Sequence, residues 1–149
     1  MEPILQKEKM KACGNAKRFV ADKMSTYQEY VSKCLNNADV VSAANELLPF
    51  DNVVKARLHF VSENSDVENM GIAIMRMDMD TDLYSLGVSV ELAETSMSEA
   101  INSTEFIVAC MTLEQIKAYV TTCDFQNAVV ASFEGAIDRS YFKFANKEL

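Results

Sequence analysis

Turn-forming residues are scarce in this chain. Of all its sequence features, this scarcity places the strongest limit on the possible folds. The 149 residues include only four glycines and two prolines. Strand-rich folds need many turns, and glycine and proline supply a large share of them. The composition therefore favours an all-α fold with short connections. A chain of this length buries enough surface to fold without a disulfide or a metal, so we expect one domain over residues 1–149.

Apolar residues at three- and four-residue steps predict about seven to nine short helices. The expected helices cover approximately residues 4–24, 26–48, 51–60, 66–79, 83–92, 96–111, 112–120, 125–134 and 138–144. Gly14 could break the first of them, and Asn36-Asn37 could instead be a turn that divides the second. Capping boxes at Ser96–Glu99 and Thr112–Gln115 would start two helices, and Gly135 would end another.

The stretch Asp66–Met79 is one of the most apolar in the chain, and Gly71 lies near its beginning. We interpret it as the start of a central core helix with Asp66 as its N-cap. Residues 75–82 then alternate between Met or Thr and charged residues, which is the pattern of a strand. The helix remains our prediction, because Met is a good helix former and a lone strand would have no partner.

The chain carries a net charge of −8, which bears on its partners. Nucleic-acid backbones and anionic membranes would repel it, so neither is expected as the main partner. Basic or amphipathic peptides are compatible with this charge, and so is a purely solubilising role.

The cysteine pattern and the chain ends indicate an intracellular protein. No pair among the four cysteines has Cys-x-x-Cys spacing, and His59 is the one histidine, which disfavours a zinc site. We expect the cysteines to be reduced and mostly buried. The charged N-terminus does not resemble a signal peptide, no apolar run approaches the ~20 residues of a membrane span, and the last residues do not resemble a membrane anchor.

Motifs for catalysis or metal binding are missing from the sequence. It contains no glycine-rich phosphate loop, no Gly-x-Ser-x-Gly and no His-Glu-x-x-His. Asp78, Asp80 and Asp82 resemble the first ligands of a calcium loop, but Leu83 stands where glycine is needed and Ser89 where the closing Glu is needed. We therefore predict no enzyme activity, no catalytic residue, no metal and no cofactor.

Several segments resemble the Bcl-2 family, in the family's order, over roughly residues 19–135. Asn69-Met70-Gly71-Ile72 is similar to the family's first homology motif, which centres on Asn-Trp-Gly-Arg, with the Trp and Arg replaced. The other similar segments are Phe19–Ser25 for the first helix, Phe50–Val54 before the motif, and Tyr119-Val120 with Phe125–Gly135 for the second motif. Divergence of this kind resembles that of Bcl-2-like proteins carried by large DNA viruses.

The resemblance implies a helical bundle around a central apolar hairpin, with an apolar groove for the BH3 helix of a pro-apoptotic partner. The groove candidates are Val53, Val54, Leu58, Asn69, Met70, Gly71, Ile72, Met75 and Arg76. Gly71 would let the ligand helix approach closely. Arg76, or in second place Arg57, would replace the family's arginine, which pairs with an aspartate of the BH3 ligand and whose position is Ile72 here.

The resemblance thus implies a viral inhibitor of host apoptosis that sequesters BH3 motifs. It would act in the host cytoplasm and associate with mitochondria through its partners, without inserting into the membrane. We also expect a homodimer, or a groove covered by residues 141–144, because an open groove would expose apolar surface. The alternative is a Bcl-2-like viral protein with a closed groove that blocks innate immune signalling through surface contacts.

Overall fold

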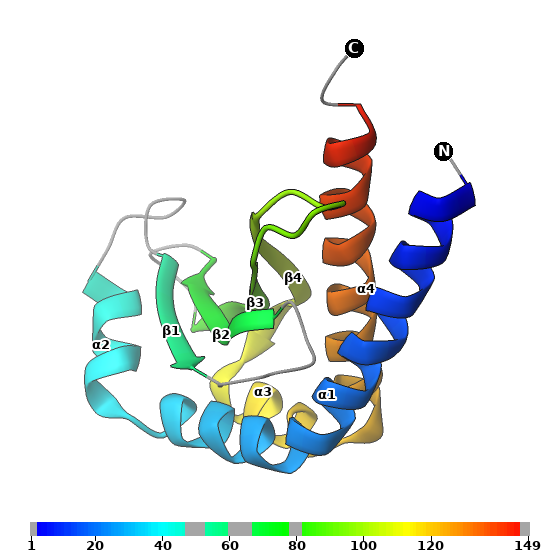
Figure 1. Cartoon of the computed structure of the whole chain (residues 1–149). Helices are drawn as coiled ribbons and strands as arrows, with labels where there is room; N and C mark the ends of the chain where they lie inside the picture. Colours follow the sequence, from blue (N-terminus) through cyan, green and yellow to red (C-terminus); the bar gives the residue numbers. More distant parts are fainter. Residues whose placement is uncertain (1–2, 47–52, 60–66, 78–81, 147–149) are drawn as a thin grey trace.

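The computed structural model describes residues 3–46, 53–59, 67–77 and 82–146. Helices flank a four-stranded antiparallel sheet, so the fold mixes α and β structure (Figure 1). The predicted all-α bundle around a central apolar hairpin is therefore wrong. No helix within the described ranges is long and apolar enough to cross a membrane.

The sheet consists of four strands that follow one another in the sequence. They are β1 (Val53–His59), β2 (Val67–Arg76), β3 (Leu83–Leu92) and β4 (Ile101–Thr112). Each strand pairs antiparallel with the next, which gives the order β1-β2-β3-β4. β2 and β3 are thus central, and β1 and β4 form the two edges.

Four of the predicted helices are strands, and β3 shows the physical reason. The predictions at 51–60, 66–79, 83–92 and 96–111 all fall on this sheet. In β3 the large side chains of Leu86, Val88 and Val90 enter the core, while Ser85 and Ser89 occupy the alternate positions. Residues two apart in a strand share a face, so this alternation specifies a strand. Our prediction of a helix over residues 83–92 did not take this alternation into account.

The connection between β3 and β4 uses polar residues in place of glycine and proline. In the segment between β3 and β4, the Thr95 hydroxyl accepts a hydrogen bond from the backbone N–H of Met97 at 3.3 Å. The backbone N–H of Thr95 also donates to the carbonyl of Ser98 at 3.0 Å. These bonds form a turn, so the helix start predicted at Ser96–Glu99 is wrong. Ser and Thr make such turns through their hydroxyl groups.

The N-terminal part of the chain forms two helices, with a boundary different from the one we favoured. α1 (Pro3–Leu35) is continuous through Gly14, and α2 (Ala38–Glu46) follows it. The alternative turn at Asn36-Asn37 is thus correct. The Asn37 side chain accepts a hydrogen bond from the backbone N–H of Asp39 at 2.9 Å, which satisfies a free donor at the start of α2.

Two helices follow the sheet. α3 (Leu113–Tyr119) begins at the capping box predicted at Thr112–Gln115, and that prediction is confirmed. α4 (Cys123–Ala145) begins after its N-cap Thr122 and runs through Gly135, so the predicted helix end at Gly135 is wrong.

The core lies between the sheet and the pair α1 and α4, which lie side by side (Figure 1). Tyr27 of α1 is fully buried, and its hydroxyl donates to the Gly71 carbonyl of β2 at 2.7 Å. Its ring stacks on Phe125 of α4 at a centroid distance of 6.1 Å. A single side chain thus joins α1, α4 and the sheet.

Candidate functional site at an exposed edge strand

The groove candidates lie in adjacent strands and not along a helical groove. Val53, Val54 and Leu58 belong to β1, and the other six belong to β2: Asn69, Met70, Gly71, Ile72, Met75 and Arg76. The strand register places Leu58 beside Met70 and Val53 beside Met75. The sequence prediction therefore grouped residues that are neighbours, but the helical groove on which it depended is contradicted by the sheet.

The described candidates in β2 have structural roles. Met70 and Ile72 are fully buried in the core. Gly71 is buried, and its carbonyl accepts a hydrogen bond from the Tyr27 hydroxyl. Met75 and Arg76 are half-buried, and the Arg76 guanidinium lies 4.0 Å from the Asp82 carboxylate.

β4 stands out as the open edge of the sheet. It is 12 residues long and pairs with β3 on one side, and no described strand lies on its other side. Glu105 is its one charged residue, and it contains neither proline nor lysine. β1, at the opposite edge, carries Lys55 and Arg57. Charged residues and proline protect strand edges from pairing with other chains, so β4 is the less protected edge.

Several apolar side chains of β4 are accessible from Phe106 onward. Phe106 is 40% exposed, and Ala109 and Cys110 are also exposed. The Phe106 ring lies beside Gly87 of β3, 3.2 Å from the place where a Cβ atom would stand. Because Gly87 has no side chain, the Phe106 ring can pack against the backbone of β3 at this position.

Two bulges divide β4 into a regular and an irregular half. From Val108 to Met111 it advances three residues, while β3 advances two, from Leu86 to Tyr84. A second extra residue lies between Phe106 and Val108. Cys110, within the first of these bulges, has a φ of 56°, which L-residues other than glycine seldom adopt. The residues from Ile101 to Phe106 keep a regular register with β3, so this half is the better template for another strand.

A shallow recess of about 280 Å³ lies at the start of this regular half. It is lined by Glu91, Leu92, Ala100, Ile101 and Asn102. Its apolar residues suit the hydrocarbon stem of a lysine or arginine, and the Glu91 carboxylate suits the charged end.

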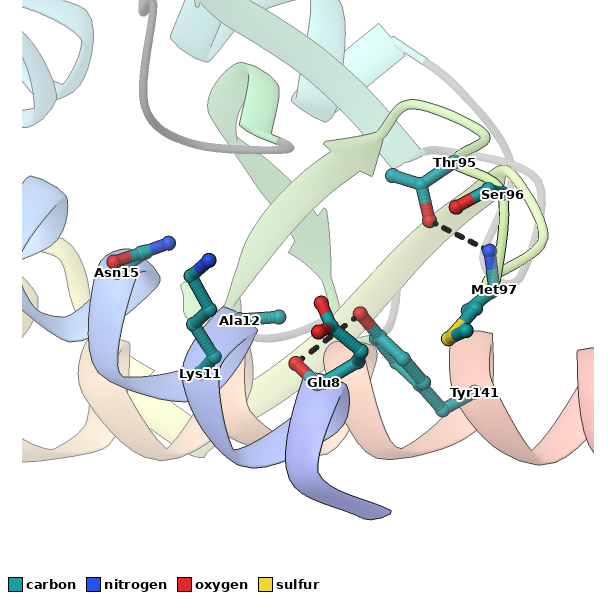
Figure 2. A pocket seen from close by; sticks show the side chains of 8 residues that line it. All are labelled: Glu8, Lys11, Ala12, Asn15, Thr95, Ser96, Met97 and Tyr141. Atoms are coloured by element: carbon teal, nitrogen blue, oxygen red, sulfur yellow. Dashed lines mark hydrogen bonds between the residues drawn. The ribbon is translucent and has the colours of Figure 1, made fainter. Parts of the chain in front are cut away.

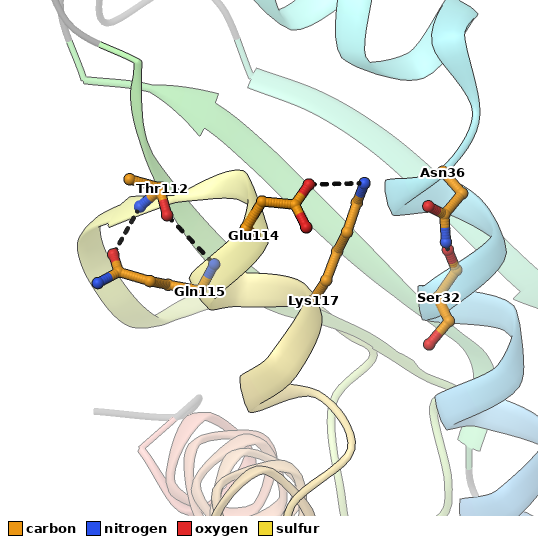
Figure 3. Close-up of polar contacts among 6 residues, drawn as sticks. All are labelled: Ser32, Asn36, Thr112, Glu114, Gln115 and Lys117. Atoms are coloured by element: carbon orange, nitrogen blue, oxygen red, sulfur yellow. Dashed lines mark hydrogen bonds and ion pairs between the residues drawn. The ribbon is translucent and has the colours of Figure 1, made fainter.

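The far end of β4 is fixed by the turn into α3 (Figure 3). The backbone N–H of Thr112 donates to the Gln115 side chain at 2.9 Å, and the backbone N–H of Gln115 donates to the Thr112 hydroxyl at 3.2 Å. On α3, Lys117 forms an ion pair with Glu114 at 3.3 Å. On one face of β4, Arg139 of α4 donates to the Ser103 hydroxyl at 2.5 Å, which holds the regular half in place.

The pKa shifts resolved among the described thiols and phenols are all upward, which is opposite to the shift that activates a nucleophile. Burial raises the pKa of the Cys13 and Cys34 thiols, so both stay protonated at neutral pH. Burial also raises the pKa of the Tyr27, Tyr30 and Tyr119 hydroxyls. Within the described ranges, no three His, Cys, Asp or Glu side chains gather as metal ligands. Asp78 and Asp80, two of the calcium-loop candidates, lie outside those ranges.

Sequence reasoning missed β4, although a local signal was present. Its residues Phe106, Ile107 and Val108 are aromatic or β-branched, which favours strands. No protein-family model, curated protein or solved structure matched this chain in the comparisons.

Proposed function

We propose that this chain is a protein-binding module that adds an extended segment of a partner protein to its sheet beside β4. The observation that carries the proposal is the long edge strand with one charge and no proline or lysine. In strand addition, backbone hydrogen bonds supply affinity and side-chain pockets supply specificity. β4 offers an edge with which no described strand pairs, and the recess beside Ile101 offers a pocket.

The chemistry of the partner follows from charge. The net charge of −8 attracts a basic segment and opposes the approach of a second copy of the same chain. The recess adds a carboxylate, that of Glu91, at the regular half of the edge. The proposed occupant is therefore an extended segment of another protein with apolar and basic residues in alternation.

The BH3-sequestering function stays a prediction that no comparison tests. A BH3 ligand binds as a helix in a groove, whereas an edge strand selects an extended chain. Met70 and Ile72, two of the proposed groove residues, are fully buried in this fold. The proposals therefore differ in the conformation of the ligand that binds.

Fluorescence anisotropy with labelled peptides of about ten residues, a length that matches most of β4, tests the proposed function. One peptide alternates Val and Lys, a second alternates Val and Glu, and a third is a helical BH3 peptide. We expect saturable binding of the Val-Lys peptide, weaker at high salt, with slower hydrogen exchange in β4. Preference for the BH3 peptide, or protection confined to other elements, would overturn the proposal. So would association of the protein with itself through β4.

Two matched variants locate the binding. Asn102 is exposed, lines the recess and pairs with Glu91 across the strands. Asn102→Lys places a positive charge at the recess, so we expect at least roughly tenfold weaker binding of the Val-Lys peptide. Asn127→Lys makes the same change at an exposed position of α4 and should leave binding unchanged. Equal effects of both variants would mean that binding depends only on the net charge of the protein, which would contradict the proposed site.

A further inference from the structure

A polar cavity of about 210 Å³ lies away from β4, between α1, the segment that joins β3 to β4, and α4. Figure 2 shows the α1 residues on one side, the connecting segment on the other and Tyr141 between them. The lining residues are Glu8, Lys11, Ala12, Asn15, Thr95, Ser96, Met97 and Tyr141. Its volume equals that of about seven water molecules, which is smaller than a typical drug site.

The walls of this cavity are held by hydrogen bonds and an ion pair. Tyr141 of α4 is 4% exposed, and its hydroxyl donates to the Glu8 carbonyl at 3.4 Å. Lys9 and Asp138 join α1 to α4 at 2.8 Å. The connecting segment is attached to α4 because the backbone N–H of Glu99 donates to the Ser140 carbonyl at 3.1 Å. The cavity is therefore formed before any ligand enters.

Two opposite charges at the cavity lack a partner within the described part of the chain. Glu8 and Lys11 both line it, one turn apart on α1, and neither forms an ion pair with a described residue. Lys9 and Lys17 of the same helix do form such pairs, with Asp138 and Glu134. A ligand that carries one positive and one negative group would satisfy both charges.

We propose that this cavity binds a small zwitterion of the free α-amino acid class. The ligand ammonium group pairs with the Glu8 carboxylate, and the ligand carboxylate pairs with the Lys11 ammonium group. The Thr95 and Ser96 hydroxyls lie across the cavity and add hydrogen-bonding capacity. Ala12 and Met97 provide an apolar surface for a short aliphatic side chain.

NMR titration of the whole chain with three groups of probes tests this site. The first group is L-alanine and L-valine, the second is succinate, which has two negative charges, and the third is 1,4-diaminobutane, which has two positive charges. We expect saturable shifts of the backbone amides of Ala12 and Met97 with the amino acids alone. Equal shifts with succinate or diaminobutane would mean that the cavity attracts any charged molecule and does not select a zwitterion. That result, or no shift with any probe, would overturn the proposal.

Variants separate a specific site from general charge effects. Lys11→Met and Glu8→Gln each remove one pairing, so each should weaken amino acid binding by roughly tenfold or more. Lys7→Met removes an exposed lysine one turn earlier on α1, outside the cavity lining, and should leave binding unchanged. Unchanged binding in Lys11→Met and Glu8→Gln would refute the assignment. Peptide binding at β4 should persist in these variants, because that edge lies elsewhere in the fold.

Discussion

Tyr27 joins α1 to the centre of the sheet through one buried hydrogen bond to the Gly71 carbonyl. Tyr27→Phe keeps the ring that stacks on Phe125 but leaves this carbonyl without its donor. A buried acceptor that loses its partner costs about 1–3 kcal/mol, so we expect the free energy of unfolding to fall by that amount. Urea unfolding followed by circular dichroism measures the change, and an unchanged midpoint would contradict this role.

The same residue predicts a dependence of stability on alkaline pH. Burial raises the pKa of the Tyr27 hydroxyl above the ordinary value near 10. The unfolded phenol therefore ionises at a lower pH than the folded one, so its contribution to stability is complete below about pH 10 and is lost above it. Unfolding midpoints between pH 8 and 11 should fall more steeply in the parent than in Tyr27→Phe. Identical slopes would refute this assignment.

Cys110 combines a φ of 56° with a position in a bulge of β4. Left-handed backbone costs an L-residue roughly 1–2 kcal/mol, and glycine avoids this cost. The greater freedom of glycine in the unfolded chain offsets about 0.4–1 kcal/mol of that gain. We therefore expect Cys110→Gly to leave stability equal or slightly higher. Cys110→Val should lower it by about 1–2 kcal/mol, because β-branched residues tolerate this conformation poorly. Thermal unfolding of both variants would measure this difference.

At the scale of the element, two helical glycines differ in the space around them. A Cβ at Gly14 of α1 would meet nothing within 4 Å, whereas one at Gly135 of α4 would lie 3.3 Å from the Arg139 guanidinium. Alanine is more favourable than glycine inside a helix by about 0.5–1 kcal/mol. Gly14→Ala should gain this amount in full, and Gly135→Ala should gain less. Denaturant titrations compare the two, and a loss of stability in Gly14→Ala would contradict a continuous α1.

The elements also show what the sequence could predict and what it could not. The capping box at Thr112 is a local interaction, so it was readable and is confirmed. The alternation in β3 was equally local, but we considered alternation only at residues 75–82, and the low glycine and proline count favoured an all-α fold. Thr95 and Ser98 show the error in that reasoning, since hydroxyl residues make the turn between β3 and β4. The scarcity of two residue types therefore does not exclude a sheet.

The candidate site depended on the arrangement of the whole molecule, which a single sequence does not specify. β4 is an edge because of the strand order, and its sequence alone gives no sign of which side lacks a neighbour. The β1 and β2 candidates are neighbours because the strands pair. Met70 and Ile72 are apolar because they are buried, and a binding groove would have required the same composition.

The strand order also predicts how stability is distributed across the molecule. β3 is buried along most of its length and paired on both sides, whereas β4 is paired on one side. Amides in β3 should exchange with solvent through global unfolding, and the unpaired amides of β4 should exchange much faster. Hydrogen exchange followed by NMR measures both sets. Equal protection in β3 and β4 would indicate that the β4 edge is covered, for example by a second copy.

The pairing of α1 with α4 has a consequence for synthesis of the chain. Each strand pairs with its successor, so the sheet can grow one hairpin at a time as residues leave the ribosome. α1 is made before the sheet, yet Phe125, which stacks on its Tyr27, belongs to α4, which is made after the sheet. The apolar side of α1 thus lacks the cover that α4 provides until α4 has been made. Chaperones should therefore bind nascent chains stalled before Cys123 more strongly than chains that already include α4.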